Sequence, residues 1–443
     1  MKEKNKGITL IALIITIIVM LILVGVSVSI LINSNLIGAA EKTATAYEEA
    51  RRKEANSEGI TINGKTINEY MSIDWEAAKA KATSKHPAQQ HTGDIGIGTD
   101  GELVNLDLWK YFPNKEKTAY GLVNNINGKA AYIGNFPNGK IEGTVPAYIK
   151  KAGDENFLPV TEMIKTFSGC TSLTTAPAIP SSVIDMDYTF LGCTSLTTAP
   201  AVPSSVTNMN GTFYDCISLT TAPAIPSSVT RMDSTFGRCT SLTTAPAIPS
   251  SVTNMYGTFS SCKSLTTAPE IPSSVTNMYV TFNDCTSLTT APEIPNSVTS
   301  INGTFSGCTS LTTAPEIPSS VTFMDATFSG CTSLTTAPEI PSSVTVMDRT
   351  FLGCTRLTTA PAIPSSVIDM DATFSGCTSL TTAPEIPSSV TKMYRTFAGC
   401  TSLTTAPEIP SSVTFMGETF IRLYKSNYSP RNSKLCYKFR EVF

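Results

Sequence analysis

The hydrophobic and polar positions of this chain repeat every 23 residues over more than half of its length. One copy, residues 327–345, reads TFSGCTSLTTAPEIPSSVT. The apolar positions of that unit are Phe328, Cys331, Leu334, Ala337, Ile340, Val344 and Met347. Because the unit recurs eleven times without an insertion, each copy should stack on the preceding one in the same geometry. We therefore expect a repeat solenoid over residues 158–420.

Proline and the β-branched residues divide each unit into short segments. The run SLTTA, with leucine and alanine alternating toward the core, predicts a short strand that stacks in parallel on its copies. Pro338 and Pro341 should end this strand, because proline donates no hydrogen bond to a ladder. The stretch from Thr350 to Cys354 predicts a tight helical corner that leads into the next strand.

The order of IPSSVT, Met, Thr-Phe, Cys and Leu resembles the leucine-rich repeats of BspA-like bacterial surface proteins. It is also similar to the palindromic amphipathic repeats of mycoplasma surface lipoproteins. One departure is LTTAPEI, which has a proline where the usual leucine-rich strand continues. The resemblance implies a leucine-rich-repeat-like solenoid that adheres to host, matrix or glycan ligands, and it implies no enzymatic activity.

The amino-terminal residues predict a membrane anchor. Residues 1–7 form a basic leader, and residues 8–32 carry no charge. At about 1.5 Å per residue, this helix is long enough to cross a hydrocarbon core of roughly 30 Å. The leader lysines favour the cytoplasm, so the later residues should lie outside the bacterial cell, at its surface. A cleaved secretory signal is the alternative, since Gly38, Ala39 and Ala40 offer small residues for cleavage.

The segment KGITLIALII resembles a prepilin-type processing segment. The resemblance implies that a prepilin-type peptidase cuts between Gly7 and Ile8 and that Ile8 becomes methylated. The anchor should continue as a charged amphipathic helix to residue 56. Ala12 stands where pilins carry a glutamate that pairs with a neighbouring subunit. This difference favours an anchored protein over the alternative, a minor pilin or pseudopilin that displays the solenoid on a type IV filament or secretion system.

Two further segments flank the repeats. Residues 57–157 contain the turn signals Asp100-Gly101, Asn127-Gly128 and Asn138-Gly139, which predict a small β-rich module that caps the solenoid. Residues 421–443 are basic and depart from the repeat. They are either a basic cap that touches an anionic surface or the product of a frameshift, and the sequence leaves both interpretations open.

Composition removes several classes of function. A net charge of −3 gives no electrostatic basis for binding nucleic acid. The two histidines, His86 and His91, do not share a helix face, so we expect no metal site, no cofactor and no histidine-dependent catalysis. Residues 96–101 match G-x-G-x-x-G, but no long strand precedes them and no apolar helix follows. We interpret them as a glycine-rich turn.

Eleven of the twelve cysteines occupy the same position in successive units. Stacked equivalent residues point in the same direction, whereas a disulfide needs converging Cβ atoms. Close cysteine pairs typical of zinc sites are absent from the sequence. Although many cysteines in a secreted protein can indicate disulfides, we expect reduced, buried thiols in this structural ladder. Its members are Cys170, Cys193, Cys216, Cys239, Cys262, Cys285, Cys308, Cys331, Cys354, Cys377 and Cys400.

Two positions that flank the core methionine vary, while the units are otherwise almost identical. The pairs are Asp185/Asp187, Asn208/Asn210, Arg231/Asp233, Asn254/Tyr256, Asn277/Tyr279, Ser300/Asn302, Phe323/Asp325, Val346/Asp348, Asp369/Asp371, Lys392/Tyr394 and Phe415/Gly417. Stacking should align them as a stripe whose residue types suit recognition of a protein or glycan. The alternative is free drift of solvent-facing positions. The candidate ligand contacts are Tyr256, Tyr279, Asp325, Asp348, Asp371 and Tyr394.

Overall fold

The computed structural model describes residues 61–62, 65–66, 94–104, 106, 109, 111–113, 115–122, 145–153 and 156–423. The chain divides into two compact units, residues 1–81 and 82–443. In the first unit, β1 (Thr61–Ile62) and β2 (Lys65–Thr66) form an antiparallel pair.

The predictions for residues 1–56, including the anchor at 8–32 and the processing site at Gly7 and Ile8, lie outside the described residues. So do His86, His91 and the tail beyond residue 423. Within the described ranges, no helix has the length and apolar character needed to cross a membrane.

The second unit begins with a six-stranded sheet in the order β4-β3-β7-β8-β6-β5. Its strands are β3 (Ile95–Gly98), β4 (Leu103–Val104), β5 (Tyr111–Pro113), β6 (Tyr120–Leu122), β7 (Pro146–Lys150) and β8 (Leu158–Glu162). Only the β6–β8 pair is parallel among the described pairs of this sheet. The expected turn at Asp100-Gly101 joins β3 to β4, so the G-x-G-x-x-G match is a strand followed by a hairpin turn.

This sheet continues into the first repeat. Glu162, the last residue of β8, forms a parallel bridge with Asp185. Thr166 donates its hydroxyl hydrogen to the carbonyl oxygen of Leu122 over 3.1 Å. The Trp109 ring stands edge-on to Phe167, with ring centroids 6.2 Å apart. No repeat precedes Phe167, the first phenylalanine of the core. Residues of the sheet region, such as Trp109, cover its ring instead.

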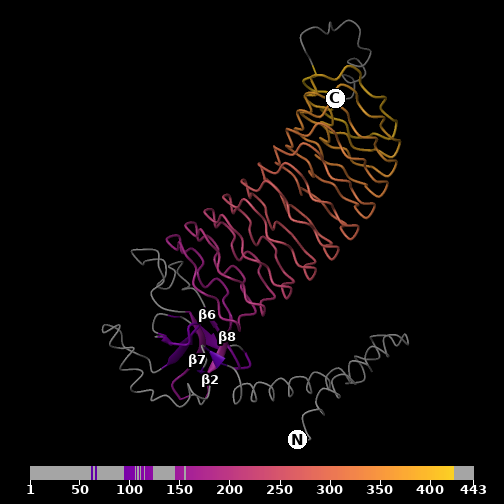
Figure 1. Ribbon diagram of the computed structural model, residues 1–443. Helices are drawn as coiled ribbons and strands as arrows, with labels where there is room; N and C mark the ends of the chain where they lie inside the picture. The colour runs from indigo at the N-terminus through magenta and orange to yellow at the C-terminus, as the bar shows by residue number, and fades with distance from the viewer. Residues whose placement is uncertain are drawn as a thin grey trace, which may run out of the picture. The chain divides into compact units, whose positions relative to one another are not determined.

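Two parallel ladders connect each repeat to the next (Figure 1). The threonine ladder consists of Thr175, Thr198, Thr221, Thr244, Thr267, Thr290, Thr313, Thr336, Thr359, Thr382 and Thr405. The variable ladder consists of Asp185, Asn208, Arg231, Asn254, Asn277, Ser300, Phe323, Val346, Asp369, Lys392 and Phe415. These ladders confirm the predicted repeat solenoid.

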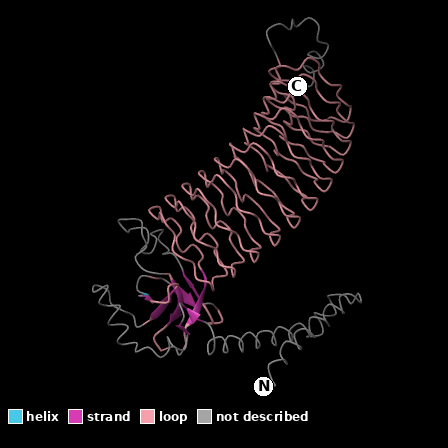
Figure 2. Ribbon diagram, viewed as in Figure 1, coloured by secondary structure: helices cyan, strands magenta, loops and turns pink. Residues whose placement is uncertain are grey.

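The strand expected over SLTTA is shorter than predicted. Within this run, only the second threonine forms a β-bridge. One bridged residue does not make a strand, so Figure 2 draws the solenoid as loops and turns. The alanine that follows leads directly into proline, which has no N–H with which to extend the ladder.

The predicted helical corner is wrong, and the described residues contain no helical element. Around Phe351, alternate amides have different partners. Thr350 donates to the Met347 carbonyl three residues back, over 3.2 Å, whereas Phe351 donates to Thr373 of the next repeat over 2.9 Å. Arg349 and Gly353 have φ angles of 52° and 72°, in the left-handed region. Because every second amide bonds to the next repeat, an α-helix cannot form there.

The solenoid interior is a set of apolar columns. The phenylalanine, cysteine, leucine, valine and methionine positions are fully buried in successive repeats, with partial exposure only in the last. From Phe167 to Phe420 the aromatic rings stack, with successive centroids 5.1 to 5.9 Å apart. Each ring covers its neighbour, so a repeat buries its apolar face only when another repeat adjoins it.

Three side-chain donors in each repeat bond to backbone carbonyls of the preceding repeat. Thr350 Oγ1 donates to the Met324 oxygen over 2.9 Å, and Ser343 Oγ to the Val321 oxygen over 2.5 Å. Cys354 Sγ donates to the Phe328 oxygen over 3.1 Å. The serine satisfies the Val321 carbonyl, which has no other donor among the described residues, while the Met324 and Phe328 carbonyls also accept the N–H groups of Thr327 and Cys331. The three side-chain bonds explain why these three positions hardly vary along the solenoid.

The eleven ladder cysteines are buried free thiols. Burial raises the pKa of the Cys354 thiol to about 12, which keeps it neutral and able to donate its hydrogen. Each thiol is therefore both a small apolar side chain and a weak hydrogen-bond donor.

Candidate functional site

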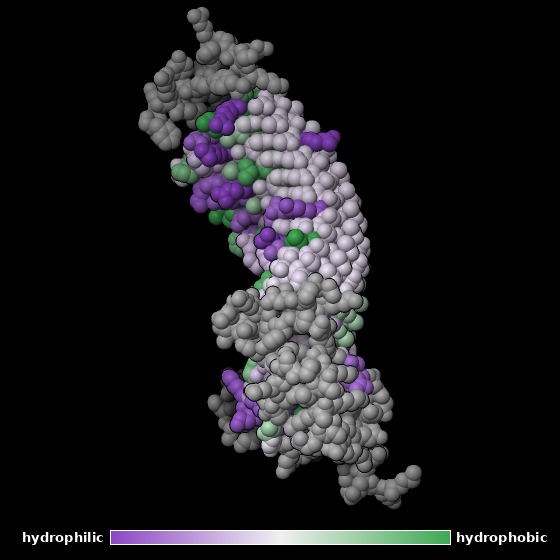
Figure 3. All heavy atoms as spheres, turned by 90° about the vertical axis from the view of Figure 1, so that its left-hand side faces the viewer, coloured by the Kyte–Doolittle hydropathy of each residue, from purple (hydrophilic) through white to green (hydrophobic). Residues whose placement is uncertain are grey.

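The variable stripe consists of the variable ladder and, in each repeat, the residue two positions further along the chain. Residues two apart in an extended segment point to the same side, while the residue between them points the other way. That intervening residue is the buried methionine, or Ile301 in one repeat. In Figure 3, near-neutral rows cross the visible face of the solenoid, and strongly hydrophilic and hydrophobic residues gather along one margin.

The tyrosine segment of the stripe has two exposed aromatic rings in contact. Tyr256 and Tyr279 stack with their centroids 5.4 Å apart, and the residues are 42% and 40% exposed. The Tyr256 N–H donates to Asn254 Oδ1 over 3.1 Å, and the Tyr279 N–H donates to Asn277 Oδ1 over 2.9 Å. Each asparagine therefore fixes the backbone that carries the neighbouring tyrosine.

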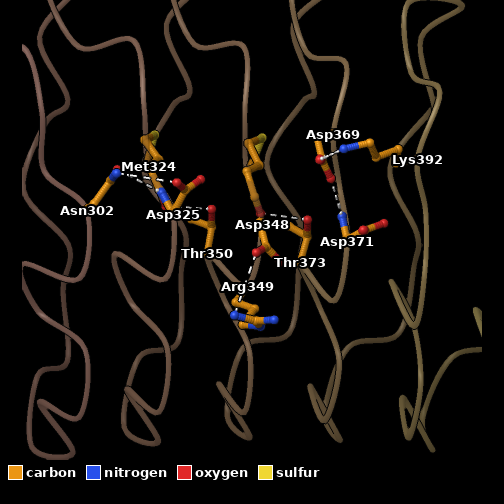
Figure 4. A network of polar contacts seen from close by, with 11 residues as sticks. Asn302, Met324, Asp325, Asp348, Arg349, Thr350, Asp369, Asp371, Thr373 and Lys392 are labelled. Atoms are coloured by element: carbon orange, nitrogen blue, oxygen red, sulfur yellow. Dashed lines mark hydrogen bonds and ion pairs between the residues drawn. The ribbon is translucent and has the colours of Figure 1, made fainter.

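The acidic segment places Asp325, Asp348 and Asp371 in successive repeats (Figure 4). Asn302 Nδ2 donates to Asp325 Oδ2 over 3.3 Å, and Asp371 Oδ1 accepts the N–H of Tyr394 over 2.7 Å. The Oδ1 atoms of Asp325 and Asp348 are buried and have no hydrogen-bond partner among the described residues. This segment therefore holds carboxylates whose charge is incompletely compensated.

Burial raises the pKa of the Asp325, Asp348 and Asp371 carboxyl groups. Neighbouring carboxylates, Asp369 among them, raise the three values further, because like charges disfavour ionisation. The N–H of Tyr394 acts in the opposite direction on Asp371, as does the Arg349 guanidinium on Asp348.

Two cations neutralise part of this acidic segment. Lys392 Nζ lies 2.9 Å from Asp369 Oδ2, and Arg349 Nη1 lies 3.8 Å from Asp348 Oδ2. In the part of the chain that the structure describes, no three side chains of the metal-binding types are grouped to hold a metal ion.

Tyr394 belongs to a third group near the end of the solenoid. Its ring is tilted against Phe415 at 5.6 Å, and the Arg395 guanidinium lies over it at 5.1 Å. Arg395 also pairs with Glu418 over 2.5 Å. The six predicted contacts thus fall into three groups along the stripe, the last two joined by the hydrogen bond from Tyr394 to Asp371, and their role in binding a ligand stays a prediction.

Sequence reasoning passed over two features of this surface. Phe323 and Phe415 were placed in the stripe but not among the candidate contacts, yet they are 46% and 52% exposed. The residue after each stripe pair adopts a left-handed φ, including Val280 at 47°. Glycine at this position in other repeats, as at Gly257 and Gly303, was the available signal.

The family model described as the BspA type leucine-rich repeat region matches residues 163–289 and 279–404 with six copies. Together the matched ranges cover more than half of the 443 residues. The chain belongs to the BspA-type leucine-rich-repeat family. The matched residues of this BspA-type protein include most of the threonine ladder and of the variable stripe.

Solved bacterial structures show a distant similarity to part of this chain. A leucine-rich repeat protein from Bacteroides ovatus is 23% identical, with a TM-score of 0.43 over 70% of this chain and 89% of that chain. A leucine-rich cell surface protein from Faecalibacterium prausnitzii is 23% identical, with a TM-score of 0.41 over 70% and 93%. A leucine-rich repeat protein from Eubacterium ventriosum is 17% identical, with a TM-score of 0.44 over 74% and 96%. No curated protein matches the sequence, so the family assignment rests on the family model.

Proposed function

We propose that this BspA-type protein is a membrane-anchored extracellular bacterial surface protein that binds host, matrix or glycan ligands through the variable stripe. One observation carries the proposal. Sequence variation is high along the variable stripe and at the residue that follows it, whereas the other ladder, which is exposed at every rung, is threonine at all eleven. Both ladders use the same type of backbone bridge, so bridging alone does not require a difference in side chains.

The chemistry of the stripe supports binding rather than catalysis. Exposed tyrosine and phenylalanine rings provide large contact areas at low entropic cost, and asparagine and aspartate provide directional polar contacts. The stripe repeats such groups at every rung, about 4.8 Å apart. A ligand that touches several rungs gains affinity through effective concentration, even where each contact is weak.

Binding to a panel of collagen, mucin and mannan surfaces tests this function. We expect the full chain to bind at least one of them. Replacing Tyr256, Tyr279 and Tyr394 together by serine should weaken that binding by about tenfold or more, because exposed aromatic residues dominate many interfaces. The matched control replaces the exposed threonines Thr266, Thr289 and Thr404 by serine. Equal loss in both variants, or no binding by the native chain, would contradict the proposal.

The anchor is part of the proposal and rests on the sequence. A prepilin-type peptidase is expected to cut after Gly7, leaving Ile8 as a methylated amino terminus and residues 8–32 in the membrane. Intact-mass measurement of the membrane-extracted protein tests this. A mature chain that begins between residues 30 and 41 would instead identify a secretory signal.

The prepilin-like segment also supports a second candidate, a minor pilin or pseudopilin that carries the solenoid on a filament. Ala12 weighs against it, since the glutamate used in pilin assembly is missing at that position. Fractionation separates the two candidates. A filament subunit would appear with sheared surface fibres, whereas an anchored protein would remain with the membrane.

A further inference from the structure

The tyrosine segment is an uncharged stretch of the variable stripe. Its three repeats contribute Asn254, Tyr256, Asn277, Tyr279, Ser300 and Asn302. The stripe residues on either side of it are charged, with Arg231 and Asp233 in the preceding repeat and Asp325 in the following one. A ligand that covers the tyrosine segment therefore meets no charged stripe residue. A polyanion that extends beyond the segment would meet the acidic segment and be repelled by its carboxylates.

Two amide groups in this segment are free to donate. Asn254 and Asn277 use Oδ1 to accept the N–H of the neighbouring tyrosine. Their Nδ2 groups have no partner among the described residues, unlike Asn302 Nδ2, which donates to Asp325. Each of the two repeats thus combines a free amide donor with a phenol hydroxyl, which both donates and accepts.

Val280 adds an apolar side chain beside the tyrosines at the expense of backbone strain. Its φ of 47° lies in the left-handed region, which β-branched residues rarely adopt. Gly303 in the next repeat leaves room for it, since a Cβ there would lie 2.9 Å from Val280 Cγ1. Every repeat has a left-handed φ at this position, so the conformation belongs to the fold, and the apolar valine is what distinguishes this repeat.

The backbone of the segment is already paired, which disfavours an extended peptide that adds as a strand. The Met255 N–H donates to the Asn277 oxygen over 3.0 Å, and the Gly257 N–H donates to the Tyr279 oxygen over 3.0 Å. Strand addition needs an unpaired sheet edge, and these bonds run between repeats along the solenoid. Recognition here must use side chains.

We infer that the tyrosine segment binds a neutral polysaccharide lying along the solenoid. The C–H faces of uncharged sugars would contact the phenol rings and Val280, as amphipathic aromatic side chains permit. Sugar hydroxyls would accept hydrogen bonds from the Asn254 and Asn277 amides. A polymer suits the site because its own repeating units can meet similar groups on successive rungs. This inference rests on the proposed function and adds the class of ligand.

The chain itself suggests a variant that keeps the fold and removes the donors. Asp185 and Asp369 occupy the asparagine position in other repeats, and their Oδ1 atoms accept the N–H of Asp187 and Asp371 over 2.9 and 3.1 Å. Asn254→Asp with Asn277→Asp should therefore keep both turns while replacing two amide donors by negative charges. Thr267→Ser with Thr290→Ser is the control, at the threonine-ladder rung that follows each asparagine along the chain.

Binding of the full chain to immobilised mannan, dextran and galactomannan tests the inference, with polygalacturonate and collagen as anionic and protein probes. We expect at least one neutral polysaccharide to bind. Its affinity should fall by about tenfold or more in Tyr256→Ser/Tyr279→Ser and in Asn254→Asp/Asn277→Asp, and stay unchanged in the threonine control.

Binding to no neutral polysaccharide, or binding that neither variant weakens, would overturn the inference. If polygalacturonate or collagen then binds through the stripe, the proposed function stands and only the ligand class is wrong. If no probe loses binding in a stripe variant, the proposed function fails as well.

Discussion

The threonine ladder and the variable ladder share one backbone geometry but differ in the side chains they carry. Each repeat contributes one residue to each ladder, through a parallel bridge. The threonine ladder has the same exposed residue at eleven rungs, whereas the variable ladder accepts Arg231, Phe323 and Lys392. The bridge needs only backbone N–H and C=O groups. The variable ladder shows that this solenoid tolerates almost any side chain at such a rung.

Positions at the core are constrained for a different reason. The threonine before each phenylalanine is buried, and its hydroxyl donates to the carbonyl of a methionine 26 residues earlier in the chain, as Thr350 does to Met324. Position and partner, rather than residue type, thus separate a structural threonine from an exposed one.

The largest effect is expected in the phenylalanine stack. Phe351→Ala should lower the free energy of unfolding by about 3–5 kcal/mol, because it removes a fully buried ring and leaves a cavity. Phe323→Ala is the matched control on the variable ladder, where the side chain is 46% exposed, and it should change stability by less than about 1 kcal/mol. Urea unfolding of both variants measures the difference. Similar losses would mean that the stripe is part of the structural core.

A smaller effect is expected for single hydroxyl groups. Thr350→Val keeps the shape of the side chain but removes one hydrogen bond to the buried Met324 carbonyl, which still accepts the Thr327 N–H, so it should cost about 0.5–1.5 kcal/mol. Thr359→Val changes an exposed residue of the threonine ladder and should cost less than about 0.5 kcal/mol. Equal unfolding midpoints for the two variants would contradict the structural role of the buried hydroxyl.

The acidic segment should give the smallest effect, and its sign depends on pH. Burial raises the native pKa of Asp325, Asp348 and Asp371, so the folded chain binds protons more readily than the unfolded chain. These groups therefore favour folding increasingly as the pH falls from neutral through the raised native values toward about 4, the unfolded value.

Asp348→Asn should remove part of this dependence and stabilise the protein at pH 7 by less than about 1 kcal/mol, because half-exposed charges are screened. Asn302 already occupies the equivalent position, so the change should fit. Urea unfolding at pH 5 and pH 7 measures the slope. An unchanged slope would show that Asp348 does not contribute to it.

The regular spacing of apolar residues predicted the solenoid. Because the repeats have equal length and no insertions, equivalent residues such as Phe351 must stack in one column. The corners were less predictable. Arg349 adopts a left-handed φ without the glycine that would have indicated it, and the pairing of alternate amides depends on the next repeat. The role of buried Thr350 was also hidden, since its partner carbonyl lies 26 residues away in sequence.

The sequence predicted which stripe residues are neighbours, but not the hydrogen bonds that their side chains make. Once the repeats stack, Tyr256 and Tyr279 must be neighbours. Which oxygen of Asp348 lacks a partner depends on side-chain conformations that the sequence does not encode locally. The same holds for the free amides of Asn254 and Asn277, which follow from the turn that each asparagine forms.

The most direct test blocks one ladder at a time with a bulky group. The ladder cysteines are buried, and burial raises the pKa of thiols such as Cys285, so a maleimide should leave them unmodified in the folded protein. With Cys436 replaced by serine, Tyr279→Cys and Thr290→Cys each present one reactive thiol, on the variable stripe and on the threonine ladder of the following repeat.

Each variant is labelled with a polyethylene-glycol maleimide, and its binding to the collagen, mucin and mannan surfaces is compared before and after labelling. This comparison separates the effect of the bulky group from that of the substitution. The account predicts that the polymer at position 279 abolishes the binding that the unlabelled Tyr279→Cys variant still shows. The polymer at position 290 should leave the binding of the Thr290→Cys variant unchanged. Loss of binding only from position 290, or from neither position, would contradict the assignment of the variable stripe as the binding surface.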